Sequence, residues 1–539
     1  MKPINTSFFD FARLIEGGYV YVDKTDRLYE LAKPGTDCIY YLPRPRRFGK
    51  SLMISTLKAL FQGRRELFRG LKIEQTDWDW EKEVYPVLHL DMSNAASTSV
   101  EQMEGKLAQM IRHRCGLFGV SYDERVNAAT NFISLLDGLP GKSPKSGKYV
   151  LLIDEYDAPI AGLLDSVEGR RELVAIRKAL HDFYVVAKSH CGDMRFLMVT
   201  GVSKFAKTSI FSAFNNPKDL TLDARAADLL GYTHEELETY FHEHIRAFAD
   251  ERGETYDAAF AELLSWYDSY QFSAKRLVKV INPVSLGNAL STRELRGYWE
   301  ATAGSTLIFD ALRAANKTPV DFSDEFSVRR LDAADALTAP TVALLYQGGY
   351  LTIDRPGEDD GKVVLKIPNR EVFDSLYDGY VAQLLGRDFA IDDFEGAASK
   401  TANALIADGV GSKFFDFLSS GFSKLPHDWV AKDEREAKRA FAAFMAFTGS
   451  RLYGESQQAN GRPDAVLETE KGVYVFEFKF DRTAAAALEQ CRERNYAAPY
   501  VADPRPVWYV ALNYNATTRT LDAPLCERAG ESASSGAFH

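Results

Sequence analysis

The feature that most constrains the fold is a short apolar segment, residues 38–42, which leads through a basic loop into a helical pattern over residues 51–61. The loop ends in Gly49, Lys50 and Ser51. A phosphate-binding loop follows the order strand, GxxxxGK[ST], helix, because backbone N–H groups at a helix N-terminus bind phosphate. We expect Lys50 to reach the β- and γ-phosphates and Ser51 to ligate Mg²⁺.

The loop departs from this pattern at one position, because Arg44 stands where the first glycine is expected. Arg46 and Arg47 add positive charge beside the predicted phosphate site, and we expect them to contact the nucleotide. A second Gly-Lys-Ser, at residues 141–143, precedes a strand-like segment and is followed by Pro144, so we interpret it as a solvated loop. The alternative for the first copy alone is a basic turn before a helix.

Two acids, Asp154 and Glu155, directly follow the most apolar strand-like segment of this half, residues 149–153. Nucleotide hydrolysis needs an acid at the end of a neighbouring strand to hold Mg²⁺, and a group that orients the attacking water. We expect Asp154 in the first role and Glu155 in the second. The alternative is that both carboxylates only mark the return of the chain to solvent. Thr200 ends another apolar segment and is a weaker candidate for sensing the γ-phosphate.

The periodicity changes along the chain. The first 230 residues alternate strand-like and helix-like patterns, which is typical of α/β architecture. A helical region follows; Thr233 and Glu236 form a capping box at its start, and residues 344–354 and 363–367 are expected to form a hairpin. The predicted fold class is α/β, with a parallel P-loop NTPase-like sheet domain (residues 1–230), a mainly helical connector (231–400) and a C-terminal α/β domain (401–539).

The last region places charges on an apolar hairpin. Strand side chains alternate, so Glu477 and Lys479 share one face of an otherwise apolar strand, which is costly unless they are paired or bind a metal. A turn around residues 470–472 would place Asp464 beside Glu477. Such a cluster attracts Mg²⁺ and can assist cleavage of a phosphodiester bond. The alternative is an edge strand whose Glu477 and Lys479 face water.

Residues on the flanking helical patterns add candidates to this cluster. Gln490 and Tyr496 lie on a face that could pack over the hairpin. Glu436, on the preceding helical pattern, is either an additional ligand or one of many exposed acids. Arg492 and Arg494 are either phosphate contacts or ordinary residues of a surface helix.

Composition sets limits on partners and compartment. The net charge of −11 excludes a uniformly basic nucleic-acid coat but not a local basic groove. The five cysteines are scattered without a CxxC pair, which suits a reducing cytosol. We find no secretory signal and no apolar run long enough for a membrane helix, and expect a cytoplasmic protein. The tail at residues 531–539 is expected to be disordered.

Taken together, these motifs resemble the prokaryotic AAA-ATPase-like proteins that carry a C-terminal nuclease domain of the PD-(D/E)xK superfamily. The matching segments occur in order over nearly the whole chain: residues 21–25, 44–52, 151–159, 199–205, 211–223, 266–272, 281–286, 367–372, 461–464 and 476–479. The family shares the missing first glycine of the phosphate loop. Two residues depart from its usual pattern, Ser269 in place of a glycine and Pro463 in place of an aliphatic residue.

The resemblance implies an ATP-binding domain, a helical middle region and a restriction-endonuclease-like domain, with ATP and Mg²⁺ (or Mn²⁺) as cofactors. The residues it carries over are Lys50, Ser51, Asp154 and Glu155 in the first domain, and Asp464, Glu477, Lys479 and Gln490 in the last. Asp23 and Lys24 match a further family element, either to position the nucleotide base or to tie the N-terminus to the sheet.

Three functions are compatible with the sequence. The first is an ATP-controlled, metal-dependent nuclease whose substrate is nucleic acid, with DNA favoured. The second is a nucleotide-dependent switch or scaffold with little turnover, suggested by Arg44 in the phosphate loop. The third is a protein that only binds nucleic acid, which the intact set of Asp464, Glu477 and Lys479 argues against. A homo-oligomer is left open, because such ATPases often take an arginine from a neighbouring subunit.

Overall fold

The computed structural model describes most of the chain, with short gaps. The described residues are 1–36, 38–139, 147–161, 163, 167–204, 217–299, 309, 312, 325–332, 339–385, 391–423, 431, 433–447, 452–454, 463–500 and 503–530. Two sequence predictions, the second Gly-Lys-Ser at 141–143 and the disordered tail at 531–539, lie outside the described residues.

The chain forms two compact units. One comprises Met1–Ile308 and Asp324–Phe373, and the other comprises Phe309–Ser323 and Asp374–His539. The first unit contains the predicted nucleotide-binding region together with most of the predicted helical region. The domain boundaries expected near residues 230 and 400 stay predictions.

A five-stranded parallel sheet forms the centre of the first unit, in the order β2-β3-β4-β1-β5. Its strands are β1 (Ile39–Pro43), β2 (Val87–Asp91), β3 (Tyr149–Asp154), β4 (Met194–Gly201) and β5 (Lys218–Asp219). Every residue of β3 is buried, as its unbroken apolar sequence predicts for a strand covered on both faces. The sheet places β4 between the strand of the phosphate loop and the strand of the two acids.

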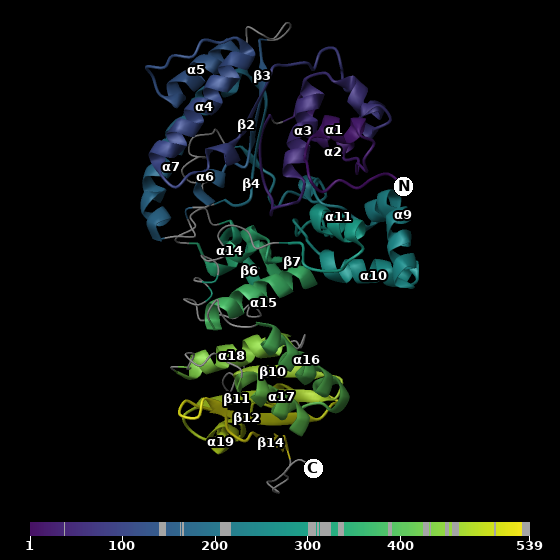
Figure 1. The fold of residues 1–539 in the computed structure, drawn as a ribbon, viewed down its shortest axis with the longest axis vertical. Helices are drawn as coiled ribbons and strands as arrows, with labels where there is room; N and C mark the ends of the chain where they lie inside the picture. The colour runs from purple at the N-terminus through teal and green to yellow at the C-terminus, as the bar shows by residue number, and fades with distance from the viewer. Residues whose placement is uncertain are drawn as a thin grey trace. The chain divides into compact units, whose positions relative to one another are not determined.

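Helices cover this sheet on both sides. Figure 1 shows α1, α2 and α3 on one side and α4, α5 and α7 on the other. The helices are α1 (Phe11–Glu16), α2 (Thr25–Ala32), α3 (Lys50–Phe61), α4 (Val100–Phe118), α5 (Ala128–Gly138), α6 (Ala158–Ala161) and α7 (Val167–Ser189). Short 3₁₀ turns join them at Arg65–Phe68, Lys72–Gln75, Met92–Ala95, Cys191–Asp193 and Ala224–Ala226.

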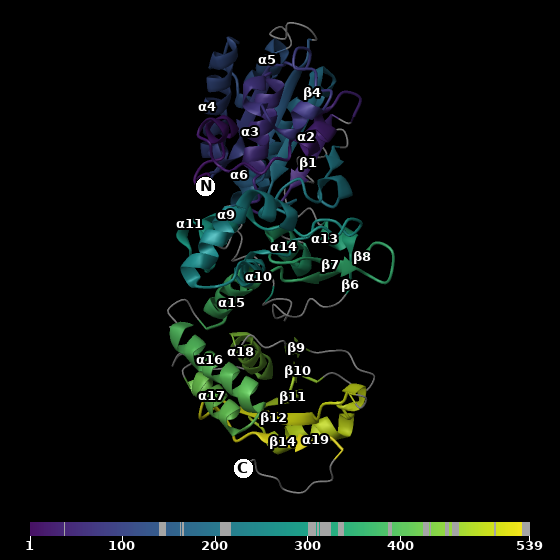
Figure 2. The same ribbon diagram turned by 90° about the vertical axis from the view of Figure 1, so that its right-hand side faces the viewer.

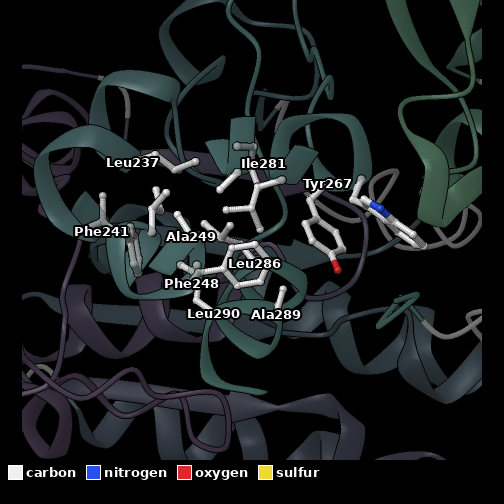
Figure 3. Close-up of a cluster of buried hydrophobic side chains, with 14 residues drawn as sticks. Leu237, Phe241, Phe248, Ala249, Tyr267, Ile281, Leu286, Ala289 and Leu290 are labelled. Carbon is white, nitrogen blue, oxygen red and sulfur yellow. The ribbon is translucent and has the colours of Figure 1, made fainter. Parts of the chain in front are cut away.

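Three further helices of the first unit pack around their own apolar core. They are α9 (His234–Arg252), α10 (Tyr256–Tyr267) and α11 (Pro283–Thr292). Their core gathers Leu237, Phe241, Ile245, Phe248, Leu263, Tyr267, Leu286 and Leu290, all nearly inaccessible to solvent (Figure 3). The predicted capping box is confirmed, because Thr233 and Glu236 exchange side-chain and backbone hydrogen bonds at the start of α9.

One predicted hairpin arm is wrong in part. Residues 344–348 belong to α14 (Thr341–Gly348) rather than to a strand. A short apolar run fits a buried helix as well as a buried strand, and tertiary packing decides between them. The strands β7 (Thr352–Pro356) and β8 (Lys362–Lys366) do pair as a hairpin, and β6 (Glu325–Ser327), preceding α13 (Val328–Leu331), completes a three-stranded antiparallel sheet.

The second unit has a six-stranded mixed sheet with the path β13-β12-β11-β10-β9, and β14 paired to β12. The strands are β9 (Leu452–Gly454), β10 (Ala465–Thr469), β11 (Gly472–Phe480), β12 (Val507–Asn515), β13 (Thr520–Leu521) and β14 (Leu525–Arg528). Its helices are α15 (Arg370–Leu385, which begins in the first unit), α16 (Ile391–Asp408), α17 (Ser412–Ser423), α18 (Glu434–Phe447) and α19 (Ala484–Arg494), with a 3₁₀ turn at Ala498–Tyr500.

Two helices cover opposite faces of the central strand β11 (Figure 2). Phe441 of α18 packs against Phe476 and Phe478, with ring centroids 5.2 Å apart in both pairs. Val473 and Val475 share a core with α19 instead. The alternation predicted for this strand is therefore confirmed, and it directs Glu477 and Lys479 toward the α19 side. No helix among the described residues is both long enough and apolar enough to cross a membrane.

Candidate functional sites

The phosphate loop closes on its own lysine. The Lys50 ammonium donates hydrogen bonds to the carbonyls of Arg44 and Pro45, each at 2.9 Å, and the side chain is almost completely buried. Gly49 precedes α3 as its N-cap, with a φ of 90°, a left-handed conformation that favours glycine. The start of α3 therefore combines backbone N–H groups that lack partners within the helix with the buried ammonium of Lys50. Both features favour binding of an anion.

Burial determines the electrostatics of Lys50. Desolvation lowers the pKa of its ammonium to about 8, although the negative charges of Asp154, Glu155 and Asp157 act to raise it. A bound polyanion would supply the compensating charge that the protein only partly provides. The site is thus built to gain from negative charge.

Arg44 explains how the loop forms without its first glycine. The side chain is only 2% exposed, and its guanidinium donates to the carbonyls of Pro43, Thr221 and Ala226 at 2.9–3.0 Å. It also lies over the ring of Phe272, 4.2 Å from the centroid. Arg44 does not have a positive φ, so its position does not demand glycine. The arginine anchors the loop to the segment after β5.

Asp154, the last residue of β3, and Glu155, which follows it, lie at the same edge of the sheet as the loop, because the carboxyl ends of parallel strands meet there. Asp154 is buried and accepts hydrogen bonds from the Thr200 hydroxyl and, at 3.1 Å, from the Glu155 backbone N–H. Glu155 has a φ of 51°, and burial raises the pKa of its carboxyl while Lys50 lowers it. Thr200, predicted as a weak candidate for sensing phosphate, here orients Asp154.

The other two arginines of the loop connect it to the rest of the unit. The Arg47 guanidinium donates to the carbonyl of Tyr298, and the Arg46 carbonyl accepts from the Asn282 amide at 3.4 Å. Buried Glu371 accepts from the backbone N–H groups of Tyr298 and its successor at 3.0 and 3.1 Å. The predicted role of Arg46 and Arg47 as nucleotide contacts therefore stays a prediction.

A cavity opens beside the phosphate loop. Arg47, Phe48 and Gly49 line it from the loop, and Leu52 and Met53 line it from α3; its other walls include Tyr21, Val22, Lys24, Leu229, Gly231 and Val284. The lining next to the phosphate loop is mostly apolar.

Asp23 and Lys24 are both buried and both form polar contacts with neighbouring segments. Asp23 accepts from the backbone N–H groups of Thr25 and Lys72 at 2.9 and 2.7 Å. Lys24 donates to Glu236 and to the Asp228 carbonyl at 2.8 Å, while lining the cavity. These contacts tie the N-terminal segment to the 3₁₀ turn Lys72–Gln75 and to α9, not to the sheet, and the role in positioning the nucleotide base stays a prediction.

The C-terminal site is organised by the β10–β11 hairpin. The register pairs Ala465 with Phe476, which sets Asp464 opposite Glu477 as predicted. The Asp464 backbone N–H donates to the Phe476 carbonyl at 3.1 Å, and its carboxylate accepts from the Phe478 N–H at 2.7 Å. Asp464 is therefore fixed by backbone contacts directly before β10 begins.

Glu477 is the most deeply buried acid of this site. Lys479 donates to its Oε1 at 2.9 Å, and its Oε2 is buried without a hydrogen-bond partner among the described residues. Burial and the nearby charge of Asp464 raise the pKa of Glu477 to about 7, against the lowering effect of Lys479. Burial also raises the pKa of Asp464. Two acids with raised pKa values beside an unpartnered oxygen are well suited to receive a cation.

Lys438 is a member of the site that the sequence analysis missed. Its ammonium donates to Asp464 Oδ1 at 2.6 Å and forms an ion pair with Glu434, one turn earlier on α18, at 2.8 Å. The signal available in the sequence was only its place two residues after Glu436, in a charge-rich helix. Glu436 as an additional ligand stays a prediction.

The candidate supporting residues on and directly after α19 differ in where they lie relative to the acids. Gln490 donates to the Tyr496 hydroxyl at 3.2 Å, and the charges of Glu477 and Asp464 act on that hydroxyl, so the pair lies beside the acids. Arg492 forms an ion pair with Glu527 of β14. This pairing favours the surface-helix alternative for Arg492.

The donor set fits a small divalent cation. Asp464 and Glu477 offer carboxylate oxygens from facing positions, and one buried oxygen lacks a partner. The described residues contain no group of three or more histidine, cysteine, aspartate or glutamate side chains arranged to hold a metal. Mg²⁺ does not need such a group, because it is usually bound by one or two carboxylates together with water and substrate phosphates.

Comparison with known proteins agrees with both halves of this description. Residues 5–211 match the family model described as a predicted AAA-ATPase. Residues 432–523 match the model of the PD-(D/E)XK nuclease superfamily. These two segments contain the phosphate loop with its acids and the C-terminal carboxylate cluster, respectively.

A curated relative extends the match to the whole chain. An uncharacterized protein encoded in the vnfD 5' region of Azotobacter chroococcum mcd 1 is 31% identical over 548 residues, covering 98% of this chain and 99% of its own length. The similarity therefore covers both matched segments of this chain. The chain belongs to the family of prokaryotic AAA-ATPase-like proteins that carry a C-terminal PD-(D/E)xK superfamily nuclease domain.

Proposed function

We propose that this protein binds and hydrolyses ATP in its first unit and cleaves phosphodiester bonds, in DNA, at a metal-dependent site in its second unit, under nucleotide control. The observation that carries the proposal is the buried juxtaposition of Asp464, Glu477 and Lys479. An acid pair with an adjacent lysine is costly in a structural hairpin. It is the arrangement that phosphodiester hydrolysis needs.

Each residue of the second unit has a distinct role in this proposal. Asp464 and Glu477 would hold Mg²⁺, with Mn²⁺ as a substitute, and the bound cation would polarise the phosphate and acidify water. The Lys479 ammonium, 2.9 Å from Glu477, would orient the nucleophilic water and offset charge that develops on the phosphate. Gln490 would support the site together with Tyr496.

The first unit supplies the parts that nucleotide hydrolysis requires. Lys50 would neutralise the β- and γ-phosphates, and Ser51 and Asp154 would hold Mg²⁺. Glu155, which follows the metal residue directly, would orient the attacking water. The neighbouring cavity would take the base and sugar. The five cysteines are unpaired, which supports a reducing, cytoplasmic setting.

The test is a nuclease assay of the purified full chain on single- and double-stranded DNA and RNA, with Mg²⁺ or Mn²⁺, with and without ATP. We expect metal-dependent DNA cleavage that changes with ATP and is lost in Asp464→Asn and Lys479→Ala. Glu489→Gln, an exposed acid on α19, serves as the matched control and should keep full activity. Cleavage that persists in the first two variants would remove the proposed active site.

A nucleotide-dependent switch without useful turnover is the second candidate. It is favoured by Arg44, which closes the loop through buried carbonyl contacts where this class of loop has a flexible glycine. ATP turnover by wild type and by Glu155→Gln separates the two. Tight ATP binding without turnover in the wild-type protein supports the switch, whereas turnover that Glu155→Gln abolishes supports the ATPase.

A further inference from the structure

Lys438 occupies the position in the nuclease-like site where a cation would be expected. Its ammonium lies 2.6 Å from Asp464 Oδ1, while the other oxygen of Asp464 is engaged by the Phe478 N–H. The helix that carries it is fixed on the sheet by Phe441. The contact is therefore imposed by the packing of α18 and is not a chance encounter of surface charges.

Each acid of the site has an ammonium partner before any metal arrives. Asp464 pairs with Lys438, which Glu434 also contacts, and Glu477 pairs with Lys479. A divalent cation that binds both carboxylates would lie next to two positive charges. The bound cation and the two ammonium groups would repel one another strongly in a buried site. We therefore expect one ammonium to leave.

Lys438 is the ammonium that is able to leave. Its side chain is 26% exposed, against 8% for Lys479, and it extends from a helix on a flexible four-carbon stem. Glu434 holds it from one turn earlier and gives it an alternative partner. Lys479, by contrast, is buried beside Glu477 on the same strand.

We propose that Lys438 competes with the metal for Asp464 and, once displaced, binds a non-bridging oxygen of the scissile phosphate. This proposal rests on the proposed nuclease function of the second unit. It assigns a substrate-contacting residue outside the Asp464, Glu477 and Lys479 set. Lys438 thereby couples metal entry to substrate binding, because the ammonium that the metal expels is the one that the phosphate receives.

The experiment measures Mn²⁺ affinity by calorimetry and DNA cleavage on the full-length protein, in wild type, Lys438→Met and the matched control Arg435→Met. Arg435 is an exposed residue of the same helix, paired with Asp433. We expect Lys438→Met to bind Mn²⁺ roughly tenfold more tightly, the scale on which neighbours of a metal site act. Cleavage should nevertheless fall by roughly tenfold or more, as for the loss of a charged hydrogen bond. Arg435→Met should change neither.

Opposite shifts in the two readouts are the signature of the proposal. If Lys438 only supports Asp464, its loss will weaken Mn²⁺ binding or leave it unchanged, and the proposal is overturned. Where wild type cleaves DNA, unchanged cleavage in Lys438→Met overturns the proposal equally, as does an absence of Mn²⁺ binding in both proteins. Tighter Mn²⁺ binding in Lys438→Met without nucleic-acid cleavage by wild type would leave the competition standing and refute the proposed nuclease function.

A second variant keeps the test open if Lys438→Met does not fold. Glu434→Gln removes the alternative partner of Lys438 and should hold its ammonium more firmly on Asp464. We expect weaker Mn²⁺ binding by about threefold, in line with the loss of one exposed ion pair. Unchanged or tighter Mn²⁺ binding in this variant contradicts the proposal.

Discussion

The two candidate sites both bury a lysine near carboxylates, but they stabilise its charge in different ways. In the first unit, Lys50 donates to two backbone carbonyls, and Asp154 accepts from the Thr200 hydroxyl. In the second unit, Lys479 and Lys438 donate directly to Glu477 and Asp464. In the first site, Lys50 and Asp154 each form hydrogen bonds with neutral groups. In the second site, the lysines and the acids form ion pairs with each other.

This difference determines which existing contacts a ligand must break in order to bind at each site. A polyanion can approach Lys50 without breaking an ion pair, and its charge relieves the desolvation that lowers the pKa of Lys50 to about 8. A cation at Asp464 and Glu477 must instead compete with ammonium groups that already neutralise both acids. Variants that remove one partner should therefore change the free energy of unfolding differently in the two units.

The largest effect is expected for Arg44→Gly, which restores the glycine of the common phosphate-loop pattern. We expect a loss of about 3 kcal/mol, because several buried carbonyls lose their charged donor. Thermal unfolding of the first unit measures it, with Arg69→Gly, an exposed site, as the control for glycine itself. Equal stability of Arg44→Gly and wild type would show that the loop does not depend on this anchor.

Lys479→Met should destabilise the second unit by about 2 kcal/mol at pH 8, because Glu477 is left as a buried charge without its partner. The direction in which this stability loss changes with pH follows from the pKa of Glu477. Its folded pKa, already raised to about 7, would rise further, and an acid with a raised folded pKa loses stability as the pH increases. The deficit should therefore shrink toward pH 6. Exposed Lys471→Met is the control, and a deficit that grows on acidification contradicts the argument.

Thr200→Val, a change that keeps the shape of the side chain, should cost about 1 kcal/mol. The buried carboxylate of Asp154 loses its hydroxyl donor but keeps the Glu155 N–H. We also expect slower ATP turnover, measured by phosphate release, because the proposed Mg²⁺ residue is less well oriented. Thr98→Val, at an exposed position, should behave like wild type. Normal ATP turnover in Thr200→Val would show that Thr200 is an ordinary residue at the end of β4 with no role in turnover.

The sequence predicted those parts of both sites that are local along the chain. The hairpin that sets Asp464 opposite Glu477 has its turn only a few residues away, so alternation and turn chemistry determine the pairing. Lys438 escaped prediction because it reaches Asp464 through the packing of a helix on the sheet, 26 residues earlier in the chain. Arg44 escaped for the same reason, since the carbonyls it binds lie 177 and 182 residues away. The helix at residues 344–348 was decided by tertiary burial, which periodicity alone does not determine.

Lys50→Met should have the smallest effect on stability, within about 1 kcal/mol of wild type near pH 7, because it removes a buried ammonium that folding disfavours along with two hydrogen bonds. Since the folded pKa of about 8 lies below the ordinary value of 10.5, wild type should gain stability as the pH rises from 8 toward 10.5. Lys50→Met should lack that gain, which denaturant unfolding of the first unit at several pH values measures. ATP affinity should still fall by roughly 10- to 100-fold, the loss of a charged contact. A large destabilisation by Lys50→Met at pH 7 would show that Lys50 stabilises the fold as Lys479 does, and the contrast between the two sites would disappear.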